Sequence, residues 1–342
     1  MLIISYLHQF FNEQKCQLYI HELRWKERRL ECPRCRSHNV KSWGKYHRRP
    51  GLKRYICKEC KRTFNDLTNT MLCRFADQRG TGSKLSLSVL ILATFLLCLS
   101  CSCRRIKREL GVHIRTAYKW CWWLRNAALS YEVNRQLDGI VEADEIYQTA
   151  GNKGQSKAGG SKGLNHEPRK RGKKQTPGRG HYNKDSPAII AWVSRKGYTV
   201  FSVVKDFTTE TVQKAANIAV KAGSVIYTDS AKSYKALVGY THDSVNHSQH
   251  EYARDDVHEN RAENSFSLLR PFLAVFRGIG KCNLPGYIGF FQFLRNFRNL
   301  NTFQQAEVIL HAALDPNVAN KARKGEFVKL FDHFQLIHTV IN

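Results

Sequence analysis

Three acidic residues lie in predicted strands and helices, where a buried carboxylate is unexpected unless it is paired or bound to metal. Asp144 falls within a predicted strand over 139–147, and Asp229 follows a predicted strand over 224–227. Glu263 falls in a helix predicted to begin near residue 260. Three convergent carboxylates can hold two Mg²⁺ ions, one activating a water or a 3′-hydroxyl and one stabilising the leaving oxygen of a phosphoryl transfer. The three acids are therefore candidate magnesium ligands for that chemistry.

The predicted helix separates its polar residues from its apolar residues. Because seven residues span about two turns, one face carries Asn260, Glu263, Ser267 and Arg270. Another face is apolar and carries Ala262, Phe266, Leu269 and Leu273. Glu263 can then point at metal while Arg270, two turns along, reaches a substrate phosphate. Pro271 removes a backbone hydrogen bond and is expected to kink the helix near Ser267.

Each acid also has a simpler interpretation. Asp144 could be an unpaired acid at a strand edge, with Glu142 or Glu145 as the true partner in the site. Asp229 could cap the next helix, a role that aspartate performs well and that is compatible with metal binding. Glu263 could be an ordinary solvated helix residue. These alternatives remain open at the level of sequence.

The segment after residue 137 must position these acids, and its pattern predicts an α/β domain. The sequence pattern first predicts mainly β-strands, with a hairpin turn at Arg195–Gly197. It then predicts alternating strands and helices. We predict an RNase H-like domain, with a mixed sheet and helices, over 137–300. Its other expected elements are strands at 188–194, 198–204 and 244–247, and helices over 208–222 and 231–237.

Four of the eleven cysteines form two Cys-x-x-Cys pairs separated by 21 residues. Two such knuckles complete a tetrahedral four-thiolate Zn²⁺ site without an open position for water, so the site is structural and should fold only with metal. The ligands would be Cys32, Cys35, Cys57 and Cys60. We predict a zinc ribbon over about 28–68 within an N-terminal segment 1–72; two redox or core cysteine pairs are the alternative. The odd cysteine count favours a reducing compartment, and the other seven are expected to be buried.

A helix–Gly–helix pattern follows within a helical region predicted over 83–130. Ile106 and Leu110 share one face, Gly111 ends the first helix, and apolar residues line the next at spacings of three and four. This is typical of a DNA-binding helix-turn-helix; a helical hairpin with a basic surface is the alternative. The residues offered to a DNA groove are Arg115, Thr116, Tyr118, Lys119 and Trp122. Those suited to phosphates are Arg104, Arg105 and Arg108.

The net charge of +27 favours polyanionic partners. Nearly all of it comes from residues 24–64, 101–126 and 151–182, with net charges of +12, +6 and +8. The third segment is a predicted Gly-rich loop, whose expected phosphate contacts are Arg169, Lys170, Arg171, Lys173 and Lys174. One apolar run, Leu85–Cys103, is about the minimum length for a membrane span but contains several serines. A buried helix is the better interpretation, so we expect no membrane partner.

These motifs together resemble the DDE transposases of bacterial insertion sequences, in the group with an N-terminal zinc ribbon. The resemblance rests on CPRC…CKEC, the helix-turn-helix, VEADEIY, IYTDSAKSY and VNHSQHEYARDDVHENRAENSFSLLR. The last resembles the group's His-x-Asn-x-x-Glu followed by Lys or Arg, matched here by His258, Asn260, Glu263 and Arg270. It implies that Asp144 and Asp229 are the first two catalytic acids. Glu263 is the preferred third, with Asn260 as the alternative, because a carboxylate binds Mg²⁺ better than an amide.

Three features bear on how closely the chain follows that group. Arg270 replaces a frequent lysine, and Pro271 is a further departure. Asp255 and Asp256 compete for the third acid but precede the helix and are expected to be solvated.

The resemblance implies an enzyme that binds terminal inverted repeats and catalyses Mg²⁺-dependent strand cleavage and transfer. Its expected partner is double-stranded DNA, both element ends and target, bound by a homo-oligomer in the bacterial cytoplasm near the nucleoid. A DNA-binding protein with an inactive catalytic domain, or a nuclease without strand transfer, is the alternative. The helical tail 301–342 is expected to pack either on the core or on a second subunit.

Overall fold

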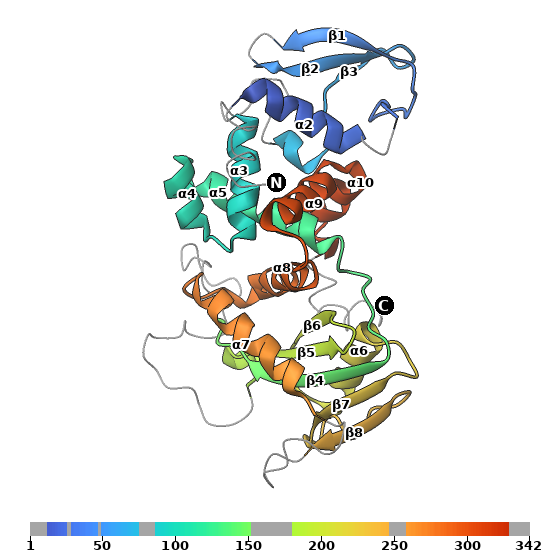
Figure 1. The fold of residues 1–342 in the computed structure, drawn as a ribbon, viewed down its shortest axis with the longest axis vertical. Helices are drawn as coiled ribbons and strands as arrows, with labels where there is room; N and C mark the ends of the chain where they lie inside the picture. The colour runs from blue at the N-terminus through green and yellow to red at the C-terminus, as the bar shows by residue number, and fades with distance from the viewer. Residues whose placement is uncertain are drawn as a thin grey trace, which may run out of the picture. The chain divides into compact units, whose positions relative to one another are not determined.

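A computed structural model describes residues 12–25, 29–46, 49–74, 86–151, 180–245 and 258–327 (Figure 1). They divide into two compact units. One contains the described residues up to Ser130 together with Phe297–Glu326, and the other contains those within Tyr131–Asn296 together with Phe327. The architecture is mixed α/β, and each unit is considered by itself.

The first unit begins with helix α2 (Glu13–Trp25) and a small antiparallel sheet. Strands β1 (Val40–Tyr46), β2 (Arg49–Cys57) and β3 (Thr63–Phe64) pair in that order. A small core forms beneath them from Cys32, Tyr55, Cys57 and Phe64. The short helix η1 (Met71–Arg74) follows.

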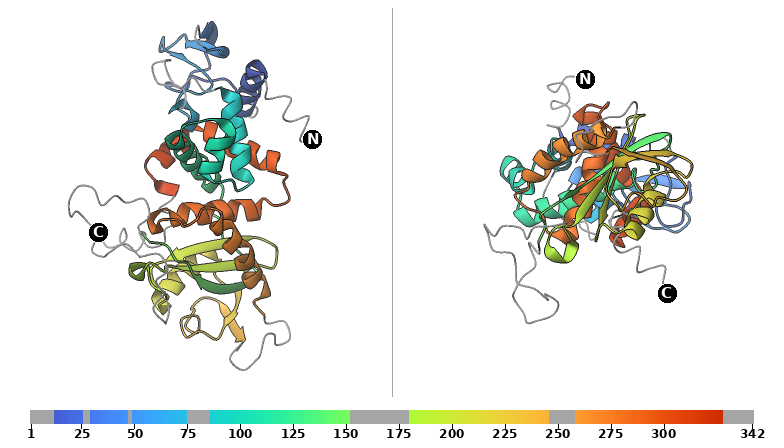
Figure 2. Two further views of the ribbon diagram at one scale, coloured as in Figure 1. Left: turned by 90° about the vertical axis from the view of Figure 1, so that its left-hand side faces the viewer. Right: turned by 90° about the horizontal axis from the view of Figure 1, so that it is seen from below.

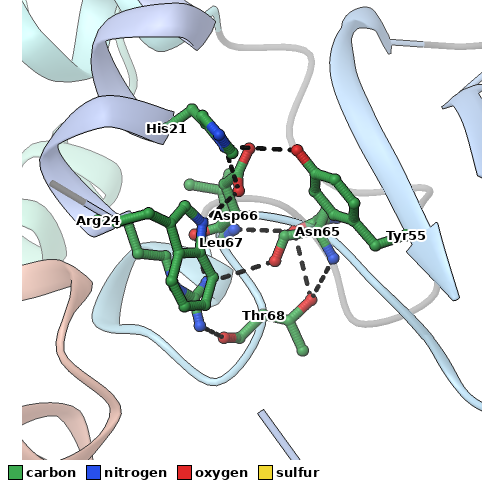
Figure 3. A network of polar contacts seen from close by, with 8 residues as sticks. His21, Arg24, Tyr55, Asn65, Asp66, Leu67 and Thr68 are labelled. Carbon is green, nitrogen blue, oxygen red and sulfur yellow. Dashed lines mark hydrogen bonds and ion pairs between the residues drawn. The ribbon is translucent and has the colours of Figure 1, made fainter. Parts of the chain in front are cut away.

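A polar network ties α2 to the segment after β3 (Figure 3). The buried Arg24 guanidinium donates to the backbone carbonyls of Asn65, Asp66 and Thr68. The Asp66 carboxylate lies 3.0 Å from His21 Nδ1 and accepts from Trp25 Nε1 at 2.8 Å. Because a guanidinium is always charged, these carbonyls and the nearby carboxylate are what make its burial tolerable.

The rest of the first unit is helical, and helices from its two separate sequence segments pack together. Phe95 of α3 (Leu87–Cys98) stacks on Phe303 of α9 (Thr302–Leu314) with 4.4 Å between ring centroids. Part of the predicted tail therefore packs within this unit. The remaining helices are α4 (Cys103–Leu110), α5 (Ile114–Leu129) and α10 (Pro316–Arg323).

The apolar run Leu85–Cys103 is divided between helices. Helix α3 ends at Cys98, and Ser102 then caps α4, so the run is not one continuous helix. Within the described ranges, no helix is long and apolar enough to cross a membrane.

Helices α4 and α5 are joined by three residues, as the helix–Gly–helix pattern predicts. Gly111 has a left-handed backbone (φ 62°), and His113 caps α5. Most of the predicted apolar positions are confirmed, because Ile106, Val112 and Trp120 are buried, whereas Leu110 and Ile114 are half-buried. Ala117 and Leu124 are buried as well.

The second unit is built on a five-stranded mixed sheet of order β6-β5-β4-β7-β8. β4 pairs antiparallel with β5 and β5 with β6, whereas β4 pairs parallel with β7 and β7 with β8. The strands are β4 (Ile140–Tyr147), β5 (Ala188–Ser194), β6 (Thr199–Val204), β7 (Val225–Asp229) and β8 (Thr241–Val245).

Helices cover both faces of this sheet (Figure 2). Helix α6 (Thr209–Ala219) packs on the face that contains Val141 and Ala143. Phe201 projects from the other face and contacts Phe266 of α7 (Asn260–Ala274) and Phe291 of α8 (Leu284–Asn296). Side chains alternate along a strand, so even-numbered residues of β4 face α7. The short helices are η2 (Tyr182–Lys184) and η4 (Lys281–Asn283).

Helix α8 closes the outer edge of strand β6. Asn296 accepts the Thr199 backbone N–H and donates to its carbonyl, both at 2.8 Å. Gln292 accepts the Phe201 N–H at 2.8 Å. Both amides also donate to the buried Glu132, at 2.9 Å from Gln292 and 2.7 Å from Asn296. These bonds satisfy edge groups that would otherwise be open to strand pairing.

One predicted element differs from the structure. The helix predicted over 231–237 is a series of turns, because Tyr234 is drawn into the core against Trp192 and Phe207. Helix α7 continues through Pro271 to Ala274. Several predicted residues lie outside the described ranges: most of the 151–182 loop with its five proposed phosphate-binding residues, Asp255, Asp256 and residues 328–342.

Candidate active site and cysteine centre

The register of the sheet places Asp144 and Asp229 side by side. Strand β4 pairs parallel with β7 so that Ala143 lies opposite Thr228. Asp144 and Asp229 are the next residues on their strands, and both project to the face that α7 covers. Both carboxylates are half-buried. The predictions that Asp144 lies within a strand and that Asp229 ends one are confirmed.

Charged residues of α7 affect the pKa of Asp144, so α7 belongs to the same site. Burial raises the pKa of Asp144 to about 7, and the negative charges of Asp229 and Glu263 act in the same direction. The Glu145 N–H, 2.7 Å from the Asp144 carboxylate, and the positive charge of Arg270 oppose this rise in pKa. Asp144 therefore experiences the fields of both acids and of the arginine that the sequence pattern selected.

The predicted faces of α7 are confirmed. Asn260, Glu263 and Arg270 are exposed, whereas Ala262, Phe266, Leu269 and Leu273 are buried. The three predicted metal-binding acids do not converge as closely as metal ligands do. In the described part of the chain, no group of three carboxylate or histidine ligand atoms lies within 4.8 Å.

A fourth acid, Glu259, belongs to this region and was missed from the sequence. Its side chain is buried at the start of α7. Burial raises the pKa of Glu259 to about 9, with further increases from the charges of Asp144, Asp229, Glu263 and Glu145. It is consequently protonated at neutral pH. Glu259 lies between His258 and Asn260 of the motif, which could have indicated that it belongs to the site. The predicted helix began only near residue 260, so its face did not include Glu259.

Four cysteine sulfurs meet in the first unit, all within 4.8 Å of one another. Cys32 Sγ lies 3.7 Å from Cys60 Sγ, and Cys35 Sγ lies 3.5 Å from Cys57 Sγ. A tetrahedron with Zn–S bonds of about 2.3 Å has edges of about 3.8 Å. The cluster therefore fits a zinc ribbon, as predicted.

The two cysteine knuckles share one backbone geometry. The Cys32 N–H donates to the Ser37 carbonyl, and the Cys57 N–H donates to the Arg62 carbonyl, both at 2.9 Å. A residue with positive φ follows each pair, Arg36 at 59° and Lys61 at 56°. The Cys60 N–H helps to lower the pKa of the Cys57 thiol to about 7, whereas the pKa of the Cys35 thiol, which is hydrogen-bonded to Cys57, is raised to about 12.

The remaining cysteines only partly follow the prediction that they are buried. Cys282 is exposed on η4, so that prediction is wrong there. Cys73 and Cys101 are half-buried, whereas the others are buried: Cys16, Cys98, Cys103 and Cys121.

The residues proposed to contact DNA through α4 and α5 lie at the surface. On α5, Arg115 and Lys119 are exposed, Tyr118 is 49% exposed and Trp122 is 36% exposed. Their spacing places them on one helical face, with Thr116 half-buried beside them. Three exposed arginines lie on α4: Arg104, Arg105 and Arg108. Arg105 pairs with Glu109 at 2.6 Å, which leaves the α4 surface largely basic.

Comparison with known proteins places the sheet and α7 within a segment that resembles a known domain. Residues 136–296 match the ISXO2-like transposase domain, and this match supports a transposase of the insertion-sequence type. A related protein of Halobacterium salinarum, described as an uncharacterized protein in transposable element ISH50, is 29% identical over 313 residues. That match covers 89% of this chain and 98% of the relative. No solved structure matches.

The raised pKa of Asp144 predicts how the stability of the metal-free protein depends on pH. Between about pH 4 and 7 the folded Asp144 retains a proton that the unfolded chain has lost. The free energy of unfolding should therefore fall as the pH rises through this window, by up to about 4 kcal/mol from this residue. Urea unfolding of the wild type and Asp144→Asn measures it, and the variant should show the shallower fall.

Asp138→Asn is the matched control for this measurement. Lys196 holds the pKa of the exposed Asp138 below its ordinary value. The stability that Asp138 adds is lost only as the pH falls below about 4, so its variant should follow the wild type across the window. Parallel curves for Asp144→Asn and the wild type would contradict the assignment.

Proposed function

We propose that this chain is a Mg²⁺-dependent DDE transposase that cleaves the ends of its element and joins the freed 3′-hydroxyls to target DNA. The main support is the position of Asp144 and Asp229 in one register on neighbouring parallel strands, within electrostatic reach of Glu263. The domain is proposed to be RNase H-like, which is supported by its antiparallel β6-β5-β4 strands followed by parallel β7 and β8.

Asp144, Asp229 and Glu263 are proposed to hold two Mg²⁺ ions. Bound there, the ions would activate the attacking oxygen and neutralise the leaving oxygen of the transferred phosphate. The charge of Glu263 acts on Asp144, and Glu263 is preferred to Asn260 as the third ligand because a carboxylate binds Mg²⁺ better than an amide. Arg270 is proposed to bind substrate phosphate, because it is exposed and its charge also reaches Asp144.

DNA is proposed to bind through the basic segments. The zinc ribbon and the α4–α5 helix-turn-helix would recognise the terminal inverted repeats, with α5 presenting its exposed face to a groove. The basic loop 151–182 would add phosphate contacts that carry no sequence information. A homo-oligomer that pairs two element ends is part of this proposal.

Strand-transfer activity tests the catalytic assignment. In Mg²⁺, the purified chain should join a duplex that carries the inverted repeat of its element to plasmid DNA. Asp144→Asn and Asp229→Asn should reduce joining to background, because an amide replaces an anionic ligand. Asp138→Asn, an exposed change on the same unit, should retain activity. Joining by either test variant would refute the assignment, and binding without cleavage by the wild type would favour an inactive catalytic domain.

Gel-shift titration over a range of salt tests the DNA interface. Arg115→Ala should weaken binding to the inverted repeat by about 1–3 kcal/mol, because a base contact is lost. Arg104→Ala should instead weaken binding to all sequences and reduce the slope of log K against log salt by about 0.9. Lys214→Ala, on the exposed side of α6, should change neither quantity. Equal effects of all three variants would contradict a specific role for α5.

Metal analysis tests the cysteine centre. The chain should contain one zinc, which Cys57→Ser should lose together with amide-exchange protection across residues 29–64. Cys282→Ser removes an exposed cysteine outside the cluster and should retain the metal. Full zinc content in Cys57→Ser would rule out the four-cysteine site.

A further inference from the structure

A fully buried carboxylate, Glu142, lies directly behind the candidate catalytic acids. It precedes Asp144 by two residues on β4, so both side chains project to the face that α7 covers. One Glu142 oxygen accepts from Arg195 Nε at 3.1 Å. The other accepts the backbone N–H of Arg261 at 2.9 Å. Glu142 is thus bonded to the first turn of α7 as well as to the sheet.

Arg195, which follows β5, connects Glu142 to the remaining parts of the site. Its Nη2 lies 3.2 Å from His258 Nε2, at the start of α7. Its guanidinium lies over the ring of Tyr227 on β7, 5.3 Å from the centroid. Arg261 Nη1 also donates a hydrogen bond to the Arg195 backbone carbonyl, at 3.0 Å. One ion pair therefore contacts every element that carries a candidate catalytic acid.

The contacts of Glu142, Arg195 and Arg261 lie two residues before the candidate catalytic acids along each element. Glu142 lies opposite Tyr227 in the β4–β7 register, two residues before Asp144 and Asp229. Arg261 likewise precedes Glu263 by two residues on α7. A helix N-terminus carries unsatisfied N–H groups and partial positive charge, so a buried anion there stabilises the helix in one position. His258 Nδ1 at 3.4 Å and Arg261 Nε at 3.8 Å also lie near the Glu142 carboxylate, so most of the polar groups that hold the start of α7 converge on this one side chain.

We propose that Glu142 is a positioning residue, which with Arg195 holds the first turn of α7 so that Glu263 faces Asp144 and Asp229. This role rests on the proposed function for its effect on chemistry, but the docking of α7 stands on the contacts alone. Glu142 touches neither metal nor DNA in this role. It acts by fixing a helix whose exposed face carries the third acid and Arg270.

The test compares Glu142→Gln with the wild-type full-length chain by hydrogen exchange and by Mg²⁺ titration of joining. Exchange across residues 258–266 should become at least about 10-fold faster, because an uncharged amide has one acceptor oxygen and cannot accept from both Arg195 Nε and the Arg261 N–H. The half-saturating Mg²⁺ concentration should rise about 10-fold or more, the usual effect of removing support behind a metal ligand. The rate at saturating Mg²⁺ should change less.

Arg195→Gln is the second variant, in case Glu142→Gln folds poorly. It should have the same two effects, and the double variant should be no worse than either single variant, because the pair acts as a unit. Glu210→Gln, which breaks only the exposed pair with Lys214 at 2.6 Å, is the matched control.

The outcomes separate this inference from the proposed function. Unchanged exchange at 258–266 in both variants, or equally faster exchange throughout β5 and β6, would overturn positioning by Glu142. Full joining by Asp144→Asn would overturn the proposed function, and the exchange data would then decide the positioning role alone. Faster exchange confined to α7 with unchanged Mg²⁺ dependence would overturn the link between α7 docking and the metal site.

Discussion

The parallel pairing of β4 with β7 is the constraint on which the candidate site depends. It places Asp144 and Asp229 at the same level and on the same face of the sheet. A slip of one residue would turn Asp229 toward the apolar face beneath α6, because side chains alternate along a strand. The contacts of Phe201 with Phe266 and Phe291 then place α7 and α8 over the polar face. The sheet positions Asp144 and Asp229, and the apolar stripe of α7 packs so that Glu263 lies on the exposed face of the helix.

Gathering carboxylates in this way opposes folding. The raised pKa values of Asp144 and Glu259 reflect burial together with mutual repulsion. Such an arrangement destabilises the ionised protein, which is common at sites where charge is kept for chemistry. By contrast, the fully buried Glu142 is paired with Arg195 and bonded to α7. Two carboxylates that lie two residues apart on one strand therefore differ in their partners, since Asp144 accepts the Glu145 N–H and is repelled by other acids.

The distribution of charge along the chain agrees with this division. The basic segments contribute nearly the whole excess of +27 and fall in the ribbon, the α4–α5 region and the 151–182 loop. The acidic site lies in a unit whose described strands and helices are far less basic. Under the proposed function, binding of a polyanion and stabilisation of its reacting phosphate would fall to different parts of the sequence. The acids would attract cations while other surfaces attract phosphates.

Several features could be predicted because they depend on neighbours in sequence. The two cysteine knuckles, the Gly111 turn and the two faces of α7 each follow from spacings within a few residues. The local pattern wrongly predicted a helix over 231–237. The apolar residues there lie in a series of turns that buries Tyr234. A short apolar spacing fits a helix and a series of turns equally well. The contact of Tyr234 with Trp192 decides for the turns.

By itself, the sequence determined which residues could do chemistry and which elements carry them. Tertiary structure alone decided that Glu259 joins the acids, that Glu142 meets Arg195 and Arg261, and that part of the C-terminal tail packs with α3. The physical reason is that strand register and burial are set by contacts between segments far apart in the chain. The charge state and partner of a carboxylate depend on those contacts, and no spacing within one segment records them.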